Sequence, residues 1–346
     1  MPDDAQLLAI VQDEARRHAR ASGTKVRTDR QSLERIVGNL RGATNEDARR
    51  LARGAIVDDG AITDSDLGEV NRAKFNLLDM DGVLHYECDT ARFSEVGGLR
   101  NLRDWLGKRE KVFLQGDASL DAPKGVLLVG VQGGGKSLAA KAVAGMWGLP
   151  LLRFDMGALY NKFFGESERN VREALRLAQT MSPCVLWIDE IEKGIATGDN
   201  DGGTSRRVLG TLLTWMAERK EPVFLVATAN RIEDLPAELI RKGRFDEIFF
   251  VDLPDASVRE EIFRIHLRRR GEEPANYDLA VLAQATDGFT GAEIEQAVVA
   301  SLYSARAAGI PLNTAQVLAE VQATVPLSVT MAEQLARLRA WCHAVS

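Results

Sequence analysis

The sequence predicts an α/β protein, with a parallel sheet that has helices on both faces and with helical segments before and after it. Between about residues 93 and 253, apolar runs of the length of buried strands alternate with helical patterns, an order typical of parallel sheets. Residues 1–75 and 254–346 carry helical periodicity without a strong strand signal. The expected strands are Val126–Val129, Pro150–Asp155, Cys184–Asp189, Phe224–Ala229 and Ile248–Val251.

These patterns divide the chain into four parts. An all-helical segment covers residues 1–75, and a connector follows at 76–92. The core that contains the sheet takes residues 93–253, and the second helical part takes residues 254–346. Thr44 and Thr63 each stand three positions before an acidic residue, so both are expected to begin helices of the first segment.

The composition is that of an ordinary intracellular globular protein. Hydrophobic residues make up 45% of the 346 positions and charged residues 27%, which is common in soluble domains. No apolar stretch approaches the roughly 18 residues that cross a bilayer, and the polar start is unlike a signal peptide, so no membrane insertion is expected. The three cysteines form no metal-spaced pair. This favours a reducing compartment, the cytoplasm or, for an organelle-encoded chain, the plastid stroma.

The net charge of −6 argues against nucleic acid as the default partner, because phosphate backbones attract basic surfaces. Two basic clusters, at residues 16–20 and 268–270, are typical of solvated helix ends, although a local patch can override the total charge. Nucleic acid is therefore the less favoured class of partner.

The most informative segment lies between the first expected strand and the helix after it. Residues 130–137 read G-V-Q-G-G-G-K-S, which fits the G-x-x-x-x-G-K-[ST] pattern of a loop that binds nucleoside triphosphates. Glycines let the chain turn tightly, so that backbone N–H groups face phosphate oxygens, and the helix adds its positive N-terminal end. Lys136 is expected to reach the β- and γ-phosphates and Ser137 to ligate Mg²⁺. The glycines expected at the phosphates are Gly130, Gly133, Gly134 and Gly135.

Polar side chains end two later strands at the edge of the sheet where ligands of such folds bind. Asp189 and Glu190 follow one apolar run, and Asn230 follows the next. Carboxylates at a buried strand end are costly unless they meet a cation or a reacting water. We therefore expect Asp189 in the Mg²⁺ shell and Glu190 as the group that orients and deprotonates the attacking water. Asn230 is expected to bond both the γ-phosphate and that water.

The motifs, taken in this order, resemble those of the AAA family proper within the AAA+ ATPases, over roughly residues 90–305. A closer resemblance is to the AAA proteins called hypothetical chloroplast reading frame forty-six, through residues 183–193, 242–254 and the tail 325–341. The resemblance implies a Mg²⁺-dependent ATPase whose C-terminal helical part is a lid over the nucleotide. The matching segments are Phe93–Leu99, Gly130–Ser137, Phe164–Glu168, Asp189–Glu190, Ala229–Arg231, Arg241–Asp246 and Gly288–Glu293.

The resemblance also assigns residues to the site. Arg241 and Arg244 match the arginines that reach the γ-phosphate held by a neighbouring subunit, which implies a homo-oligomer, usually a hexameric ring. Many other AAA+ groups have a nucleotide-sensing arginine in the place of Gly291–Ala292, and its absence fits the AAA family proper. The remaining expected nucleotide contacts are Val96, Gly97, Leu138, Ile262, His266, Gly291 and Ala292.

Phe163 and Phe164 precede Gly165 where AAA unfoldases carry a loop that faces the ring pore. Aromatic side chains there can hold a polypeptide with little selectivity. The alternative is that both phenylalanines pack into the core or a subunit interface. The Asp-Gly-Phe relay of many protein-threading members is missing from residues 213–220, and no His-Glu-x-x-His metalloprotease motif occurs.

Three uses of ATP hydrolysis stay open. The leading hypothesis is a ring that remodels or unfolds a protein client, whose identity the sequence does not give. The second is an ATP-driven assembly switch whose partner binds the N-terminal helices, and the third is nucleic-acid remodelling. The N-terminal segment is expected to be lid-like, because residues 42–48 echo residues 288–294, although two independent helix caps give the same pattern. Relative to the narrower family, the chain is short before this segment, as though an ATPase-like core were missing.

Overall fold

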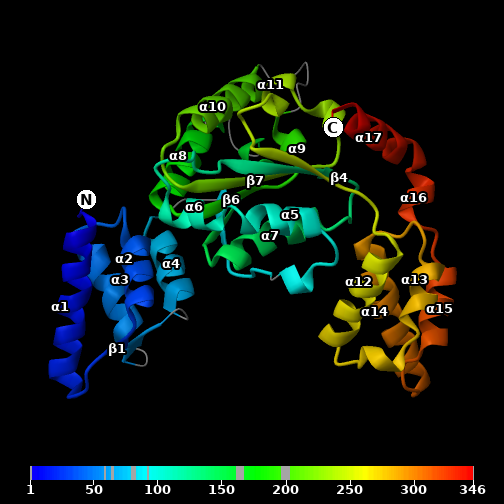
Figure 1. The fold of residues 1–346 in the computed structure, drawn as a ribbon, viewed down its shortest axis with the longest axis horizontal. Helices are drawn as coiled ribbons and strands as arrows, with labels where there is room; N and C mark the ends of the chain where they lie inside the picture. The colour runs from blue at the N-terminus through cyan, green and yellow to red at the C-terminus, as the bar shows by residue number, and fades with distance from the viewer. Residues whose placement is uncertain are drawn as a thin grey trace.

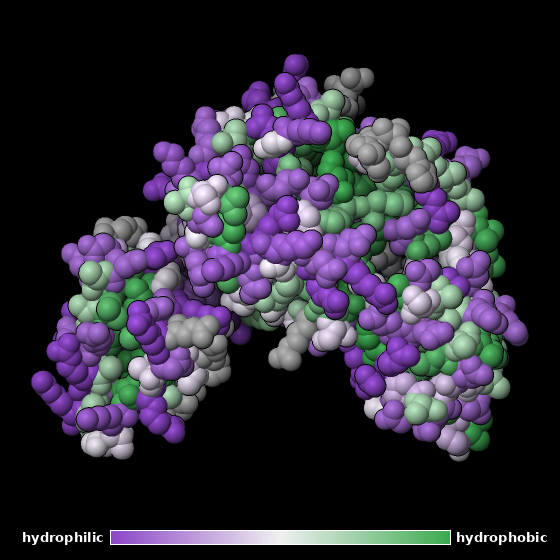
Figure 2. Space-filling view, viewed as in Figure 1, coloured by the Kyte–Doolittle hydropathy of each residue, from purple (hydrophilic) through white to green (hydrophobic). Residues whose placement is uncertain are grey.

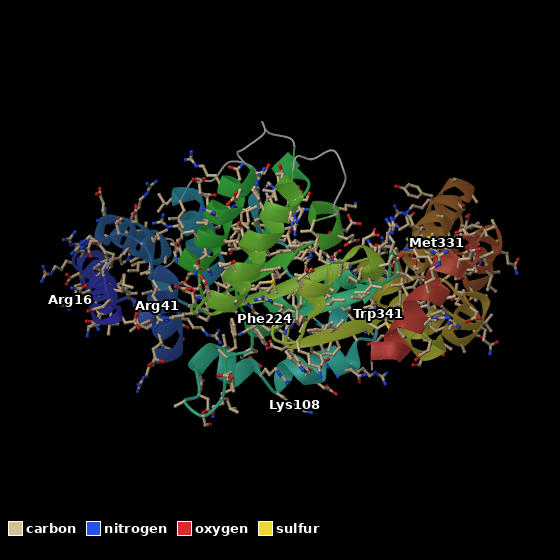
Figure 3. The ribbon with its side chains drawn as sticks, turned by 90° about the horizontal axis from the view of Figure 1, so that it is seen from above. Arg16, Arg41, Lys108, Phe224, Met331 and Trp341 are labelled. Atoms are coloured by element: carbon tan, nitrogen blue, oxygen red, sulfur yellow. The ribbon has the colours of Figure 1, made fainter. Side chains whose placement is uncertain are left out.

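The computed structural model describes residues 2–57, 60–63, 66–78, 83–91, 93–160, 167–195 and 203–345. Figure 1 shows an arch in which a central sheet with its helices joins an N-terminal and a C-terminal helical bundle. Figure 3, seen from above, places the two bundles at opposite ends of the sheet. The predicted α/β fold with helical parts on either side is confirmed. Within the described ranges, no helix combines the length and the apolar character needed to cross a membrane.

The central sheet has six strands in the order β3-β5-β6-β7-β4-β8. All neighbouring pairs are parallel except β3 with β5. The five predicted strands are present, each within a residue or two of the expected bounds. The strands are β3 (Leu84–Glu87), β4 (Gly125–Gly130), β5 (Leu151–Phe154), β6 (Cys184–Ile188), β7 (Val223–Ala229) and β8 (Glu247–Val251).

One strand lies where the sequence predicts a connector. β3 pairs antiparallel with β5, with Leu84 opposite Phe154 and Glu87 opposite Leu151. Its sequence, Leu-His-Tyr-Glu, has no apolar run, because an edge strand is held mainly by backbone hydrogen bonds to one neighbour. The sheet therefore begins before Phe93, where the sequence places the start of the core.

Alternate residues of the strands feed two separate apolar cores, one on each face of the sheet. Val126 and Phe224 point to the face covered by α5, α6 and α7, whereas Leu127 and Leu225 point to the face covered by α8, α9 and α10. Figure 1 shows these helices below and above the sheet. The covering helices are α5 (Arg100–Gly107), α6 (Glu110–Gln115), α7 (Lys136–Trp147), α8 (Ser167–Thr180), α9 (Ile191–Ile195), α10 (Thr204–Glu218) and α11 (Ala237–Ile240). Short 3₁₀ turns occur at Phe93–Glu95, Ala158–Tyr160, Ile232–Asp234 and Pro274–Asn276.

The C-terminal bundle has its own apolar core, and a tail leads from it back to the sheet. Leu338 of the tail is 1% exposed and belongs to the core above the sheet. Arg339 donates from Nε and Nη2 to Asp252, just after β8. Figure 3 labels two residues of this tail, Met331 near the bundle and Trp341 beside the sheet. The bundle comprises α12 (Ala256–Arg269), α13 (Leu279–Ala285), α14 (Gly291–Ala308) and α15 (Thr314–Gln322), and the tail comprises α16 (Leu327–Thr330) and α17 (Ala332–Val345).

The N-terminal bundle also encloses a core of its own, and apolar residues show between its polar helices in Figure 2. The Thr44 hydroxyl accepts a hydrogen bond from the Asp47 N–H and so caps α3 as predicted. The segment is not entirely helical, because two two-residue strands pair in parallel before α2 and α4. The elements are α1 (Asp4–Ser22), β1 (Arg27–Thr28), α2 (Arg30–Leu40), α3 (Asn45–Val57), β2 (Ala61–Ile62) and α4 (Asp66–Leu77).

The two bundles are built alike. Four helix pairs recur: α1 packs on α2 and α3 as α12 packs on α13 and α14, and α4 packs on α2 and α3 as α15 packs on α13 and α14. An aspartate caps the first helix in each case, Asp3 for α1 and Asp255 for α12. The third helix follows a threonine whose hydroxyl accepts a hydrogen bond from the N–H three residues on, Thr44 for α3 and Thr290 for α14.

Lys74 of α4 forms a hydrogen-bonded contact between the N-terminal bundle and the part of the chain that contains the central sheet. Its side chain is buried, and Nζ donates to the Arg41 carbonyl at 2.5 Å and to the Thr180 carbonyl at the end of α8 at 2.8 Å. Burial lowers the pKa of Lys74 to about 8. Gly42 fits beside Thr180 with φ +80°, and a Cβ at Gly42 would lie 2.9 Å from Thr180 Cγ2. Phe75 of α4 adds an aromatic contact with Tyr86 of β3, at 5.8 Å between ring centroids.

Candidate active site

The glycine-rich loop joins β4 to α7 and passes close to other backbone. A Cβ on Gly130 would lie 2.1 Å from the Val251 carbonyl oxygen of β8, so only glycine fits there. Gly133 and Gly135 have φ +76° and +92°, in the left-handed region that favours glycine. Gly134 donates its N–H to the Val131 carbonyl. The loop therefore has the tight conformation that the sequence predicts, with α7 beginning at Lys136.

Lys136 lies buried under the loop, with 6% of its surface exposed. Its Nζ donates to the Gly130 carbonyl at 3.0 Å and to the Val131 carbonyl at 2.7 Å. Burial lowers the pKa of Lys136 to about 8, while the nearby carboxylates, Glu192 foremost, act in the opposite direction. An anion in the loop would favour the ammonium form of this side chain.

Asp189 follows β6, and Ser137 lies in the first turn of α7. The Ser137 hydroxyl donates to Asp189 Oδ1 at 3.2 Å, and the Thr228 hydroxyl of β7 donates to the same oxygen at 2.6 Å. A hydroxyl and a carboxylate side by side are oxygen donors of the kind that Mg²⁺ prefers. The donor set at the foot of the loop therefore fits the ion expected from the sequence.

Glu190 and Asn230 meet beside this pair. Asn230 Nδ2 donates to Glu190 Oε1 at 2.8 Å, and Lys193 of α9 forms an ion pair with Glu190 Oε2. Glu190 has φ +48°, a left-handed backbone that is uncommon for glutamate, and its N–H donates to the Thr228 hydroxyl at 2.9 Å. The pair with Glu190 raises the pKa of Lys193. The structure thus brings together the strand-end residues that the sequence singles out.

Three further residues at this site were missed from the sequence. Glu192, 5% exposed, accepts the Asn230 N–H at 2.9 Å, and burial raises the pKa of its carboxyl. Lys193 pairs with Glu190, and Thr228 bonds both Asp189 and Glu190. Two signals in the sequence were available for them. Glu192 and Lys193 are charged residues between the apolar positions of a short helix, and Thr228 is a hydroxyl residue in an otherwise apolar strand.

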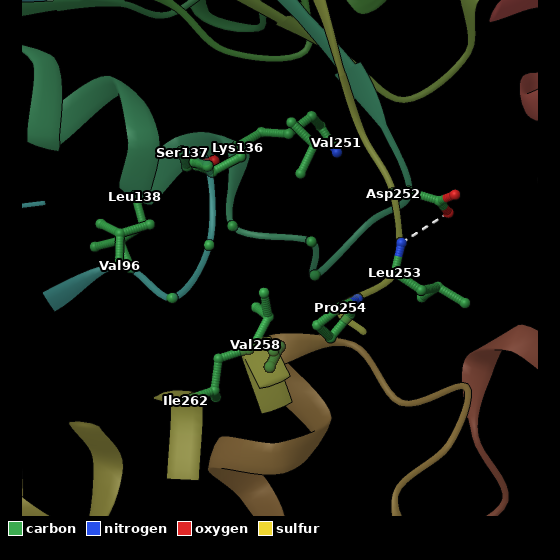
Figure 4. A pocket seen from close by; sticks show the side chains of 18 of the residues that line it. Val96, Lys136, Ser137, Leu138, Val251, Asp252, Leu253, Pro254, Val258 and Ile262 are labelled. Carbon is green, nitrogen blue, oxygen red and sulfur yellow. Dashed lines mark hydrogen bonds between the residues drawn. The ribbon is translucent and has the colours of Figure 1, made fainter. Parts of the chain in front are cut away.

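A cavity of about 910 Å³ extends from the loop to the C-terminal bundle. Figure 4 shows it, with Val96, Leu138 and Ile262 around one end and Lys136 and Ser137 on the loop side. A Cβ on Gly97 would lie 2.5 Å from Ile262 Cγ1, so the bundle closes tightly on this strip of backbone. The predicted residues that line the cavity are Val96, Gly97, Gly133, Gly134, Gly135, Lys136, Ser137, Leu138, Asp189, Glu190, Asn230, Ile262, His266, Gly291 and Ala292.

The C-terminal bundle contacts the loop directly. The Ala292 N–H donates to the Gly133 carbonyl at 3.3 Å, at the start of α14. His266 of α12 is 8% exposed, its Nδ1 lies 3.4 Å from Glu295 Oε1, and burial lowers its pKa although Glu295 opposes this. The bundle therefore supplies one wall of the cavity, as the lid resemblance implies.

Arg241 and Arg244 lie apart from this cavity. Neither is among the described residues that line it. Arg241 is exposed, whereas Arg244 is half-buried and donates from Nη1 to the Leu213 carbonyl at 3.0 Å. Phe163 and Phe164, predicted to face a pore, lie outside the described residues.

Two family models match the chain. The model for the ATPase family associated with various cellular activities (AAA) matches residues 126–253. A model described as SpoVK-like AAA ATPase, second domain, matches residues 5–81. The first match covers the loop, both strand ends and the segment with the two arginines.

Similar proteins point the same way. The chain is 41% identical over 318 residues to the uncharacterized AAA domain-containing protein ycf46 of Guillardia theta, covering 90% of this chain and 63% of that protein. It is 45% identical over 273 residues to ycf46 of Gracilaria tenuistipitata var. liui, covering 78% and 56%. The proteasome-activating nucleotidase of Aeropyrum pernix is 37% identical over 279 residues, covering 76% and 66%. The chain thus spans less than two thirds of each of these proteins. Residues 126–253 belong to the AAA ATPase family, and the chain is a relative of the ycf46 proteins.

Proposed function

We propose that this chain hydrolyses Mg²⁺-bound ATP at the cavity between the loop and the C-terminal bundle. The observation that carries the proposal is the Glu190–Asn230 contact beside the Ser137–Asp189 pair. Ser137 and Asp189 would hold Mg²⁺, which neutralises phosphate charge when bound. Residue roles within the site rest on this geometry and on the family resemblance.

The remaining chemistry belongs to side chains of the chain itself. Lys136 binds phosphate oxygens from beneath the loop. Glu190 orients a water molecule and accepts its proton, while the Asn230 amide fixes the direction of the Glu190 carboxylate. Val96, Gly97 and Ile262 enclose the adenine ring of ATP and keep water from one end of the cavity.

We further propose that the active site is completed by a neighbouring copy in a ring, most simply a hexamer. Supporting this, Arg241 is exposed and lies outside the cavity of its own chain. A guanidinium brought to the γ-phosphate stabilises charge in the transition state, and such arginines contribute roughly 10³ to 10⁵ in rate in related triphosphatases.

The work done with ATP is proposed to be the remodelling of a protein client inside the cell. The similarity to proteasome-activating nucleotidases supports this use. Phe163→Ala should abolish remodelling and spare basal hydrolysis if the client is threaded. Unchanged remodelling by Phe163→Ala rings would reject threading.

An assembly switch is the second candidate, favoured by one observation. The N-terminal bundle repeats the helix packing of the C-terminal bundle. We propose that it is a lid-like body which serves as a partner surface. On this hypothesis, deletion of residues 1–75 abolishes partner binding, whereas Phe163→Ala has little effect.

The central experiment measures ATP turnover of the wild-type chain and of Glu190→Gln. The variant should bind ATP with near-normal affinity and hydrolyse it at least about 100-fold more slowly, because the amide cannot accept the proton. Near-normal turnover would remove Glu190 from the role of base. The same slow variant, held in ATP, suits affinity capture of the client.

A further inference from the structure

Thr228 is a polar residue in the middle of the sheet. It belongs to β7, lies opposite Leu128 of β4, and is 0% exposed. The other residues of β7, Val223–Val226, Ala227 and Ala229, are apolar and buried. A buried hydroxyl is costly unless it is hydrogen-bonded, so its partners indicate why it is there.

Both hydrogen-bonding functions of this hydroxyl serve the catalytic strand end. It donates to Asp189 Oδ1 at 2.6 Å and accepts the Glu190 N–H at 2.9 Å. One oxygen therefore fixes the side chain of the first residue after β6 and the backbone of the second. That backbone has φ +48°, which is strained for glutamate and needs support from its surroundings.

A second set of contacts comes from Asn230, which directly follows β7. Asn230 donates from Nδ2 to Glu190 Oε1, and its own N–H donates to Glu192 Oε1. Thr228 within β7 and Asn230 just after it therefore both contact Glu190, the second residue after β6. Asn230 thus holds the side-chain carboxylate of Glu190, and Thr228 holds its backbone N–H.

We propose that Thr228 is a positioning residue for ATP hydrolysis. Its hydroxyl aims the Asp189 carboxylate toward Ser137 and sets the backbone turn that directs Glu190 to the attacking water. The inference rests on the proposed function, since it assigns a role within that reaction. A displacement of about 1 Å in such a group can cost roughly 100-fold in rate.

The test compares Thr228→Val, Thr228→Ser and Thr286→Val. Valine keeps the shape of threonine and removes the hydroxyl, whereas serine keeps the hydroxyl. Thr286, also 0% exposed, donates its hydroxyl to the Leu282 carbonyl of α13 and is the matched control for loss of a buried hydroxyl.

Thr228→Val should lower kcat about 10- to 100-fold and raise the Mg²⁺ concentration for half-maximal turnover about threefold or more, with KM for ATP changed less than about twofold. Thr228→Ser should stay within about threefold of wild type in kcat, and Thr286→Val should keep wild-type kinetics even if its Tm falls. A Thr228→Val kcat within about twofold of wild type, or a Thr228→Ser enzyme as slow as Thr228→Val, would overturn the proposal. Wild-type turnover and its loss in Glu190→Gln, measured in parallel, test the proposed function separately.

Discussion

Glu14 and His266 occupy matching positions in the two helical bundles. Each lies the same number of residues after the aspartate that caps its first helix. Glu14 forms an ion pair with Arg49 of α3 at 3.4 Å, and His266 Nδ1 lies 3.4 Å from Glu295 Oε1 of α14. The acidic residue is on the first helix of the N-terminal bundle, whereas in the C-terminal bundle it is on the third helix. Of these residues, only His266 and Glu295 line the cavity beside the glycine-rich loop. The two bundles therefore share a helix arrangement but place different side chains at this position.

The first prediction is that nucleotide binding depends on His266 and is indifferent to Glu14. His266→Ala should weaken ATP binding roughly 3- to 10-fold, as for loss of one polar contact. Glu14→Ala should leave ATP affinity unchanged but lower Tm, because Arg17, Arg49 and Arg53 surround this buried carboxylate. Isothermal titration calorimetry gives both affinities, and equal weakening by the two variants would contradict the assignment.

The second prediction concerns pH and Lys74. Its pKa falls from 10.5 to about 8 on folding, so the folded chain binds this proton less tightly than the unfolded chain does. Between about pH 8 and 10.5 the unfolded state holds more protons, and this group's contribution to stability therefore rises with pH. Below that window the cost of burying the charge is present in full.

Thermal melts of wild type and Lys74→Met from pH 7 to 10 test this. The Tm of wild type relative to Lys74→Met should increase as pH rises through 8. Lys141→Met, whose ammonium is a partly exposed partner of Glu87 and Asp89, is the control. A difference between wild type and Lys74→Met that stays flat over this range would show that Lys74 keeps an ordinary pKa.

The sequence predicted the central part of the fold because buried parallel strands leave a strong signal. Val126–Val129 must be apolar on both faces, and the glycine-rich loop needs its glycines for close approaches such as Gly130 to Val251. β3 left no such signal, since backbone pairing to β5 suffices at an edge. Hydrophobic periodicity does not report backbone pairing of this kind at the edge of a sheet.

The candidate site divides in the same way. Lys136, Asp189 and Asn230 fall in motifs whose spacing along the chain carries the chemistry. Thr228 and Glu192 act across neighbouring elements, and their partners become visible only when β6, β7 and α9 are placed side by side. Residues that act by positioning other residues are therefore the ones that could not be predicted from the sequence.

The third prediction contrasts two glycines. Gly130→Ala should destabilise the fold by at least about 2 kcal/mol, because its Cβ would lie 2.1 Å from the Val251 carbonyl oxygen. Gly210→Ala, in the interior of α10 with nothing within 4 Å of its Cβ, should be neutral or stabilise by roughly 0.5–1 kcal/mol. Urea denaturation measures both changes in the free energy of unfolding. A well-folded Gly130→Ala chain with wild-type stability would refute the close packing of β4 and β8.

The fourth prediction tests whether Arg241 acts across a subunit boundary. Arg241 is exposed and outside the cavity, so Arg241→Ala alone should hydrolyse ATP slowly although its own nucleotide site is intact. Glu190→Gln alone should be slow for the opposite reason, since it has the arginine but lacks the base. In mixed assemblies, some interfaces pair a wild-type Glu190 with a wild-type Arg241, and part of the turnover should return. Lys242→Ala, one residue away and also exposed, is the control and should be active by itself. If the mixture is no faster than the sum of the two variants, while sizing shows intact mixed assemblies, Arg241 does not act in trans.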